Sequence, residues 1–93
     1  MRFVVTRSEV REQLVRFASE IAGIPAEEIT DAATIDRELR LESVAFIELQ
    51  VALEEHYRIE IDPILIVQLN RVGAIVDYVY GQVVGEDHAL LPN

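Results

Sequence analysis

Apolar residues recur every three or four positions along most of this 93-residue chain, and this spacing is the period of an α-helix. The first such segment is predicted from about residue 7 to residue 22. Thr6 and Glu9 have the spacing of a capping box before it, and Gly23 is placed to end it. Its core-facing residues are expected at helical spacing: Val10, Leu14, Phe17 and Ile21.

A long connection follows over residues 23–42. Pro25 and the polar run 30–34 argue against a helix here. A loop of about twenty residues is unusual in a small domain unless it has a function. We therefore expect an ordered crossing that is held by its own apolar side chains: Ile24, Ile29, Ile35 and Leu39.

Two further helices are predicted after a helix over residues 43–57. A short one starts with Asp62 as its N-cap and Pro63 at its first position, and ends near Asn70. The last is expected over residues 72–84, with Gly85 closing it and four residues facing inward: Ile75, Val76, Val79 and Val83. The sequence thus predicts an all-α fold, a small bundle of three main helices plus one short helix with a long first loop.

The length and composition suit one domain. We divide the chain into an N-terminal lead-in (1–6), a helical domain (7–85) and a C-terminal tail (86–93). Because the start of the chain is interrupted by charged residues and its longest apolar stretches are far too short to span a bilayer, no leader or membrane segment is expected. We expect a cytoplasmic monomer.

The helix over residues 43–57 has two faces of different character. With Ser43 at 0° and about 100° per residue, one face is expected to be core: Ala45, Phe46, Leu49, Ala52, Leu53, His56 and Tyr57. The other face spans about 0° to 140° and holds both aliphatic and acidic residues: Ser43, Val44, Ile47, Glu48, Val51, Glu54 and Glu55. An exposed aliphatic stripe edged by carboxylates is typical of a docking surface for a partner with an apolar groove and a basic rim. The alternative is a merely solvated acidic helix.

The charge of the chain narrows the possible partners. Seventeen acidic residues against eight basic ones give a net charge of −9, and every basic residue is Arg. Such a surface repels nucleic acids and anionic membranes, so neither is expected as a partner, whereas proteins with basic patches are favoured. Since the chain has no Lys, lipoyl or biotinyl attachment and Schiff-base catalysis are excluded.

Catalysis is not expected. The imidazole bases of this chain are His56, on the predicted core face, and His88, in the tail, and neither has the neighbours that a metal site needs. Glu54 and Glu55 are expected to point into solvent, where neither is desolvated enough for acid–base work. Ser43 itself has an ordinary alternative interpretation as a helix N-cap, although Phe46 stands where a capping box would have an acid.

The run Leu39-Arg40-Leu41-Glu42-Ser43-Val44 resembles the motif of the acyl carrier protein family, which is close to Leu-Gly-Xaa-Asp-Ser-Leu and opens an acidic second helix after a long loop. The stretch 53–61 is similar to the end of that helix and the turn after it. The resemblance covers about residues 7–84 and implies the fold of that family.

The resemblance further implies that a phosphopantetheinyl transferase attaches a 4′-phosphopantetheine arm from coenzyme A to Ser43. The arm would hold an acyl, polyketide or aminoacyl intermediate as a thioester. Partners would be the transferase and the enzymes that load, modify and transfer the cargo through basic docking patches. The residues at the family's docking positions are Glu42, Val44, Ile47, Glu48, Val51, Glu54 and Glu55.

Three departures from the motif bear on the pathway. Arg40 replaces a Gly, Glu42 an Asp and Val44 a Leu. Together they favour a specialised biosynthetic pathway over housekeeping fatty-acid synthesis, and the sequence does not separate a fatty acyl, polyketide or aminoacyl cargo. The alternative is an acidic interaction module of the same fold in which Ser43 stays unmodified.

Overall fold

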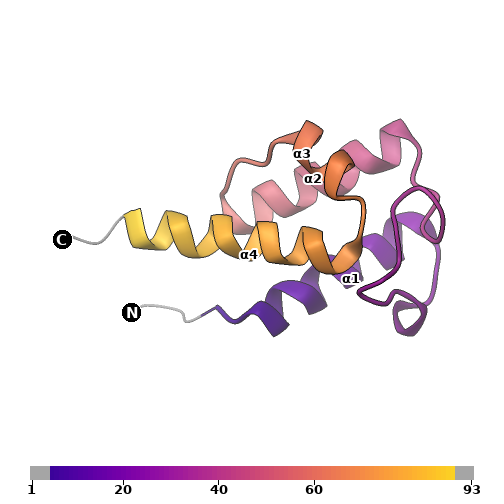
Figure 1. The fold of residues 1–93 in the computed structure, drawn as a ribbon, viewed down its shortest axis with the longest axis horizontal. Helices are drawn as coiled ribbons and strands as arrows, with labels where there is room; N and C mark the ends of the chain where they lie inside the picture. The colour runs from indigo at the N-terminus through magenta and orange to yellow at the C-terminus, as the bar shows by residue number, and fades with distance from the viewer. Residues whose placement is uncertain (1–4, 90–93) are drawn as a thin grey trace.

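The computed structural model describes residues 5–89, with side chains described as far as Gly85. Within that part the chain forms four α-helices and no β-strand (Figure 1). The helices, with one short 3₁₀ turn in the long loop, are α1 (Arg7–Ala22), η1 (Ala26–Glu28), α2 (Ser43–Tyr57), α3 (Pro63–Leu69) and α4 (Val72–Ala89). The predicted all-α bundle with one short helix is confirmed.

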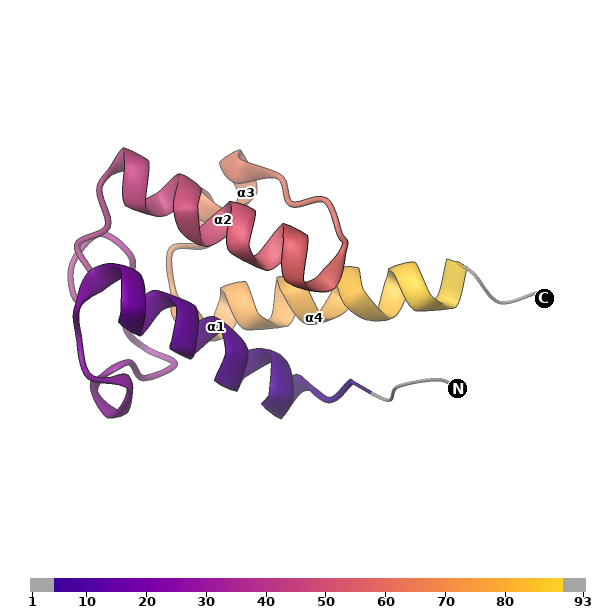
Figure 2. The same cartoon turned by 180° about the vertical axis from the view of Figure 1, so that it is seen from behind.

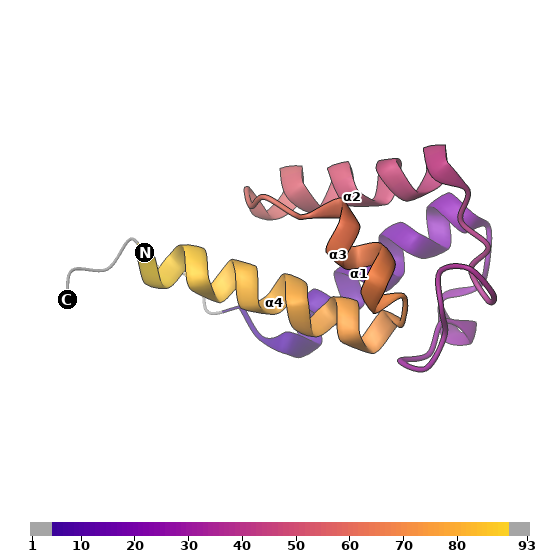
Figure 3. The same ribbon diagram turned by 45° about the horizontal axis from the view of Figure 1, so that its top comes forward.

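The three long helices pack lengthwise, and the long loop closes one end of the bundle. Figures 1 and 2 show α1 and α4 running in opposite directions, with α2 antiparallel to α1. The short helix α3 lies between α2 and α4 (Figure 3). This arrangement places the start of α2 at the end of the molecule where the loop crosses.

Local capping accounts for the ends of α1 and the start of α3. Thr6 Oγ1 accepts a hydrogen bond from the Glu9 N–H at 3.1 Å. At the other end, Gly23 adopts a left-handed conformation with φ 72° and its N–H donates to the Ser19 carbonyl. The Asp62 carboxylate accepts from the Ile64 N–H at 2.9 Å and begins α3 as predicted.

The prediction that Gly85 ends the last helix is wrong, because α4 continues through it to Ala89. Glycine terminates a helix by adopting a left-handed conformation, and of the described glycines Gly23 has one whereas Gly85 does not. The boundary proposed between residues 85 and 86 therefore falls inside α4. Residues 1–4 of the lead-in and 90–93 of the tail lie outside the described residues.

The core is aliphatic, and the long loop contributes to it directly. Four loop side chains are buried among those of the helices, which confirms that the loop is an ordered crossing: Ile29, Ala33, Ile35 and Leu39. Ile24 is partly buried against them. The helices and the turn before α3 supply the rest: Val10, Leu14, Val15, Ala18, Leu49, Leu53, Ile59, Ile61, Ile66, Val72, Ile75, Val76 and Val79. Phe17, Ile21 and Val83, expected to face inward, are partly buried.

The loop also caps the start of α4. The carbonyl oxygens of Ala33 and Asp31 accept hydrogen bonds from the N–H groups of Val72 and Gly73 at 2.8 and 2.9 Å. The first N–H groups of a helix have no partner within the helix, so these loop carbonyls satisfy two of them. The loop and α4 are therefore joined through their backbones.

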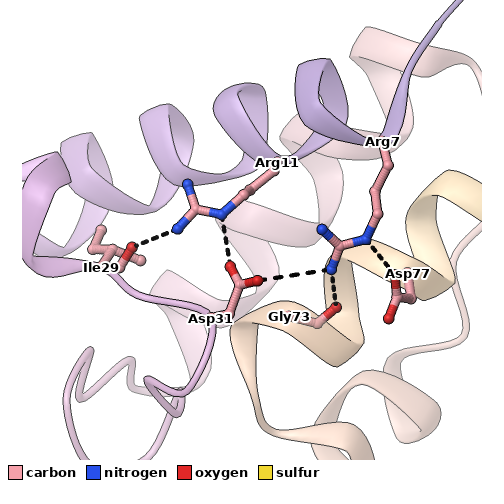
Figure 4. Close-up of polar contacts among 6 residues, drawn as sticks. All are labelled: Arg7, Arg11, Ile29, Asp31, Gly73 and Asp77. Atoms are coloured by element: carbon pink, nitrogen blue, oxygen red, sulfur yellow. Dashed lines mark hydrogen bonds and ion pairs between the residues drawn. The ribbon is translucent and has the colours of Figure 1, made fainter.

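Two arginines of α1 join the loop and α4 through ion pairs (Figure 4). Arg11 Nε donates to the Asp31 carboxylate at 2.6 Å, and Arg11 also donates to the Ile29 carbonyl. Arg7 donates to Asp77 on α4, and its Nη2 lies 3.9 Å from Asp31 Oδ2. The side chains in these pairs are 34–65% accessible to solvent, so each pair contributes little by itself. Together they fix the loop across one end of α1 and α4.

Candidate functional site

Ser43 is the first residue of α2, and its side chain is exposed. The N-cap is the preceding residue, Glu42, whose carbonyl accepts the first helical hydrogen bond from the Phe46 N–H at 2.8 Å. The alternative interpretation of Ser43 as an N-cap is therefore wrong. Among the described residues its hydroxyl makes no hydrogen bond. The hydroxyl is thus available for covalent chemistry.

A hollow of about 280 Å³ lies beside Ser43, between the loop, α2 and α3. Its lining is mainly apolar: Ile35, Asp36, Leu41, Ser43, Phe46, Val67 and Asn70. Two of its three polar residues, Asp36 and Asn70, bond to each other, with Asn70 Nδ2 donating to Asp36 Oδ1 at 3.1 Å. This hydrogen bond and one from Thr34 lower the pKa of the Asp36 carboxyl. Asp36 and Asn70 therefore satisfy each other, the Ser43 hydroxyl stays without a hydrogen bond among the described residues, and the rest of the wall is apolar.

A second hollow, of about 510 Å³, lies on the other side of residues 40–44, against the end of α1. Its lining combines aliphatic side chains with three acids and one base: Ile21, Ala22, Ile24, Glu38, Leu39, Arg40, Leu41, Glu42, Val44, Ala45 and Glu48. Arg40 has a left-handed backbone with φ 51°. The start of α2 is thus flanked by two hollows of different chemistry.

The predicted aliphatic stripe on α2 is exposed. Val44, Ile47 and Val51 are 70, 55 and 40% accessible. The structure adds two residues of α3 that the sequence analysis missed, since Ile64 and Val67 are 67 and 60% accessible. A signal was present, because an apolar run around a helix of two turns cannot all face a core on one side. We call these five residues the apolar patch.

Three acidic residues of the predicted docking surface, Glu42, Glu48 and Glu55, are exposed. The expectation that Glu54 also points freely into solvent is wrong. Glu54 is half-buried, and its Oε2 accepts a hydrogen bond from the N–H of the buried Ile61 at 2.9 Å. The physical reason is that the chain after α2 folds back over this side chain. Glu54 therefore holds the turn that leads to α3.

His56 does not lie in the core, contrary to the prediction. It is exposed, and its ring packs edge-on against Phe17 of α1 and Tyr57, with ring centroids 5.7 and 4.7 Å apart. The last turn of α2 lies at the rim of the contact with α1, so a residue on the inward side of the wheel remains accessible there. The side chain of His88 lies outside the described residues.

The described residues hold no group of His, Cys, Asp or Glu side chains suited to a metal ion. None of the helices in that part of the chain is long and apolar enough to cross a membrane. The site is therefore built from an exposed hydroxyl, two hollows and the apolar patch with its acidic rim.

Comparison with known proteins identifies this arrangement. Residues 12–79 match the family described as "Phosphopantetheine attachment site". The acyl carrier protein of Thermobifida fusca is 27% identical over 74 residues, which cover 80% of this chain and 94% of that protein. The acyl carrier protein of Saccharopolyspora erythraea is 30% identical over 71 residues, which cover 76% of this chain and 75% of the relative.

A solved structure agrees with these matches. The acyl carrier protein from Enterococcus faecalis superposes with a TM-score of 0.71 at 29% identity, covering 84% of this chain and 99% of that one. Sequence and fold therefore agree. The chain belongs to the acyl carrier protein family, and is a carrier with a covalently attached 4′-phosphopantetheine rather than an enzyme.

Proposed function

We propose that Ser43 is the attachment residue and that the loaded arm carries an acyl intermediate between partner enzymes. The observation that carries this proposal is the exposed hydroxyl at the first position of α2, which is not used as a cap and makes no hydrogen bond among the described residues. The arm supplies a terminal thiol, which this chain lacks because it has no Cys.

Attachment needs one bond exchange. The Ser43 oxygen forms a bond to the phosphorus next to the pantetheine half of coenzyme A, while the bond from that phosphorus to the bridging oxygen of the pyrophosphate breaks. The adenosine bisphosphate half leaves, and the hydroxyl proton passes to a base of the transferase. The accessible oxygen of Ser43 suits this attack, since no neighbouring side chain has to move away.

The apolar patch is proposed as the surface that partner enzymes contact. It lies on α2 and α3 next to Ser43, and Glu42, Glu48 and Glu55 supply exposed negative charge on the same helix or at its start. An apolar centre with a charged rim suits a partner with a complementary basic rim. Phosphopantetheinyl transferase and the enzymes that load and unload the cargo are the proposed partners, and the chain is proposed to work as a cytoplasmic monomer.

The cargo and pathway are proposed from the surroundings of Ser43. The hollow of about 280 Å³ beside it has an apolar lining apart from Ser43 itself and the paired Asp36 and Asn70, which supports an acyl or polyketide cargo with an apolar end. Arg40, Glu42 and Val44 depart from the usual motif, and this supports a specialised biosynthetic pathway.

Mass measurement tests the attachment residue. The purified apo protein is incubated with coenzyme A, Mg²⁺ and a promiscuous phosphopantetheinyl transferase. We expect a gain of one arm for the natural protein and for Ser8→Ala, an exposed serine on α1, and no gain for Ser43→Ala. A gain in Ser43→Ala would move the attachment elsewhere. No gain in the natural protein with several transferases would favour an unmodified interaction module.

A further inference from the structure

Arg40 is an isolated positive charge beside Ser43 on a strongly acidic protein. Its side chain is exposed, and among the described residues it makes no ion pair, whereas Arg7 and Arg11 both pair with aspartates. It lines the larger hollow together with Glu42 and Val44, the two neighbours of Ser43. Arg40 is therefore three residues before the attachment residue and has no ion-pair partner among the described residues.

The backbone of Arg40 makes its presence costly. With φ 51° it occupies the left-handed region that favours glycine, and glycine is the residue that the acyl carrier motif has at this position. A side chain retained against such strain points to a function for that side chain. Three other charged residues line the same hollow, Glu38, Glu42 and Glu48, and among described residues none of them is within ion-pair distance of Arg40.

We propose that Arg40 binds the phosphodiester of the arm on Ser43. This inference rests on the proposed attachment at Ser43. The phosphodiester brings one negative charge to a position next to the Glu42 carboxylate, and the two repel each other. Arg40 compensates that charge, and its planar guanidinium can donate two hydrogen bonds to phosphate oxygens.

The Arg40 side chain is long enough to reach a phosphodiester on Ser43. Arg40 and Ser43 are three residues apart, so their Cα atoms are separated by at most about 11 Å. The phosphorus would be bonded to Ser43 Oγ and the guanidinium is at the end of a long side chain, so the two lengths together can cover this span. Because the phosphate is tethered to the same chain, the pair forms without the entropy cost of bringing two molecules together.

The test compares apo and loaded forms of four proteins: the natural chain, Arg40→Gln, Arg40→Lys and Arg58→Gln. Arg58 is a matched control, since it is an exposed Arg with φ 56° at the opposite end of α2. Mass spectrometry first establishes that each protein carries the arm. The readouts are the change in melting temperature on loading and the ³¹P chemical shift of the loaded protein at low and high salt.

The change in melting temperature on loading should be about 1–5 °C lower for Arg40→Gln than for the natural chain. This difference corresponds to the stabilisation that one exposed ion pair gives a domain of this length. Arg58→Gln should behave as the natural chain and Arg40→Lys should lie between. The ³¹P shift should differ between the natural chain and Arg40→Gln at low salt and converge at high salt.

Equal changes in melting temperature and equal ³¹P shifts for the loaded natural chain and Arg40→Gln would overturn this inference, while the mass would still support attachment. An equal effect of Arg58→Gln would also overturn it, because a general charge effect would then explain the result. Failure of all four proteins to gain the arm would instead overturn the proposed function itself.

Discussion

The backbone of Gly73 lies directly against Asp31 (Figure 4), and the Gly73 N–H donates to the Asp31 carbonyl at 2.9 Å. A Cβ on residue 73 would lie 3.1 Å from the Asp31 Cβ and 3.2 Å from its carbonyl oxygen. The loop that leads to Ser43 is thus joined to the start of α4 at a point where a Cβ would fit only if the loop moved by a few tenths of an ångström. This close approach is what allows Asp31 to meet Arg7 and Arg11 of α1.

Replacing Gly73 with Ala should therefore destabilise the fold. We expect a loss of about 1–3 kcal/mol in the free energy of unfolding, because the loop must move away from α4. Gly81 in the same helix is the control, since nothing lies within 4 Å of a Cβ there. Gly81→Ala should raise the free energy of unfolding by about 0.5–1 kcal/mol, because Ala has a higher helix propensity than Gly. Urea unfolding measures both, and a gain in Gly73→Ala would contradict the close contact.

Asp31 should make stability depend on pH in the acid range. The hydrogen bond from Arg11, followed by the charges of Arg11, Arg7 and Arg71, holds the pKa of Asp31 below its ordinary value. A carboxyl whose pKa is lower in the folded state stabilises the fold above the pKa of the unfolded state, and this contribution is lost as pH falls through the folded-state pKa. The loss should therefore occur below about pH 4.

Urea midpoints between pH 6 and pH 2 measure this dependence. Asp31→Asn should lower the midpoint at pH 6 and flatten its decline at acid pH. Glu20→Gln makes the same change of charge on the exposed surface of α1, and it should leave the decline almost unchanged. A decline in Asp31→Asn as steep as in the natural protein would show that the pairs with Arg11 and Arg7 do not contribute.

The sequence predicted the helices well where their ends depend on nearby residues. Thr6, Gly23 and Asp62 act within one turn of their own position, so their capping roles could be identified without the fold. Gly85 was misjudged because a glycine ends a helix only when the surrounding chain places it in a left-handed conformation. The ion pairs of Arg11 with Asp31 and of Arg7 with Asp77 join residues 20 and 70 positions apart, and no local pattern indicates them.

The site was predicted in the same uneven way. A helical wheel gives the direction of a side chain, which sufficed for Val44, Ile47 and Val51. It does not give the element that covers each direction. Glu54 is covered by the chain that returns toward α3, and His56 extends beyond the contact with α1, so both were misplaced. The two hollows beside Ser43 depend on loop geometry and could not be seen in the sequence.

Glu54 and Glu55 should differ in how much they contribute to the stability of the fold. Glu54→Ala should lower the free energy of unfolding by about 1–3 kcal/mol, because the N–H of the buried Ile61 loses a charged acceptor. Glu55→Ala removes the same group from an exposed position and should change it by less than about 0.5 kcal/mol. Thermal and urea unfolding measure both variants, and equal stabilities would show that the Glu54 contact is not made in solution.

Arg40 should be a measurable source of strain in the apo protein. Arg40→Gly should increase the free energy of unfolding by about 1 kcal/mol, because glycine adopts a φ of 51° without steric cost. Arg37 in the same loop does not have a positive φ, so Arg37→Gly should lower the free energy of unfolding by about 0.5–1 kcal/mol. The comparison is made by urea unfolding before the arm is attached. A loss in Arg40→Gly would mean that the side chain stabilises the apo fold by more than its backbone costs.

Charge reversal at Glu48 tests the proposed docking surface. Glu48 is exposed on α2 and lines the larger hollow beside Ser43, so Glu48→Arg should slow attachment of the arm by a transferase with a basic patch. We expect a reduction of roughly 3–10-fold at low ionic strength, because surface charges act mainly on the rate of encounter. The reduction should shrink in 0.5 M salt, where the charges are screened over a few ångströms.

Glu20→Arg makes the same change on α1 and should have a smaller effect on the rate, with both variants melting as the natural protein does. Equal slowing by the two variants would mean that net charge, and not the face around Ser43, governs the encounter.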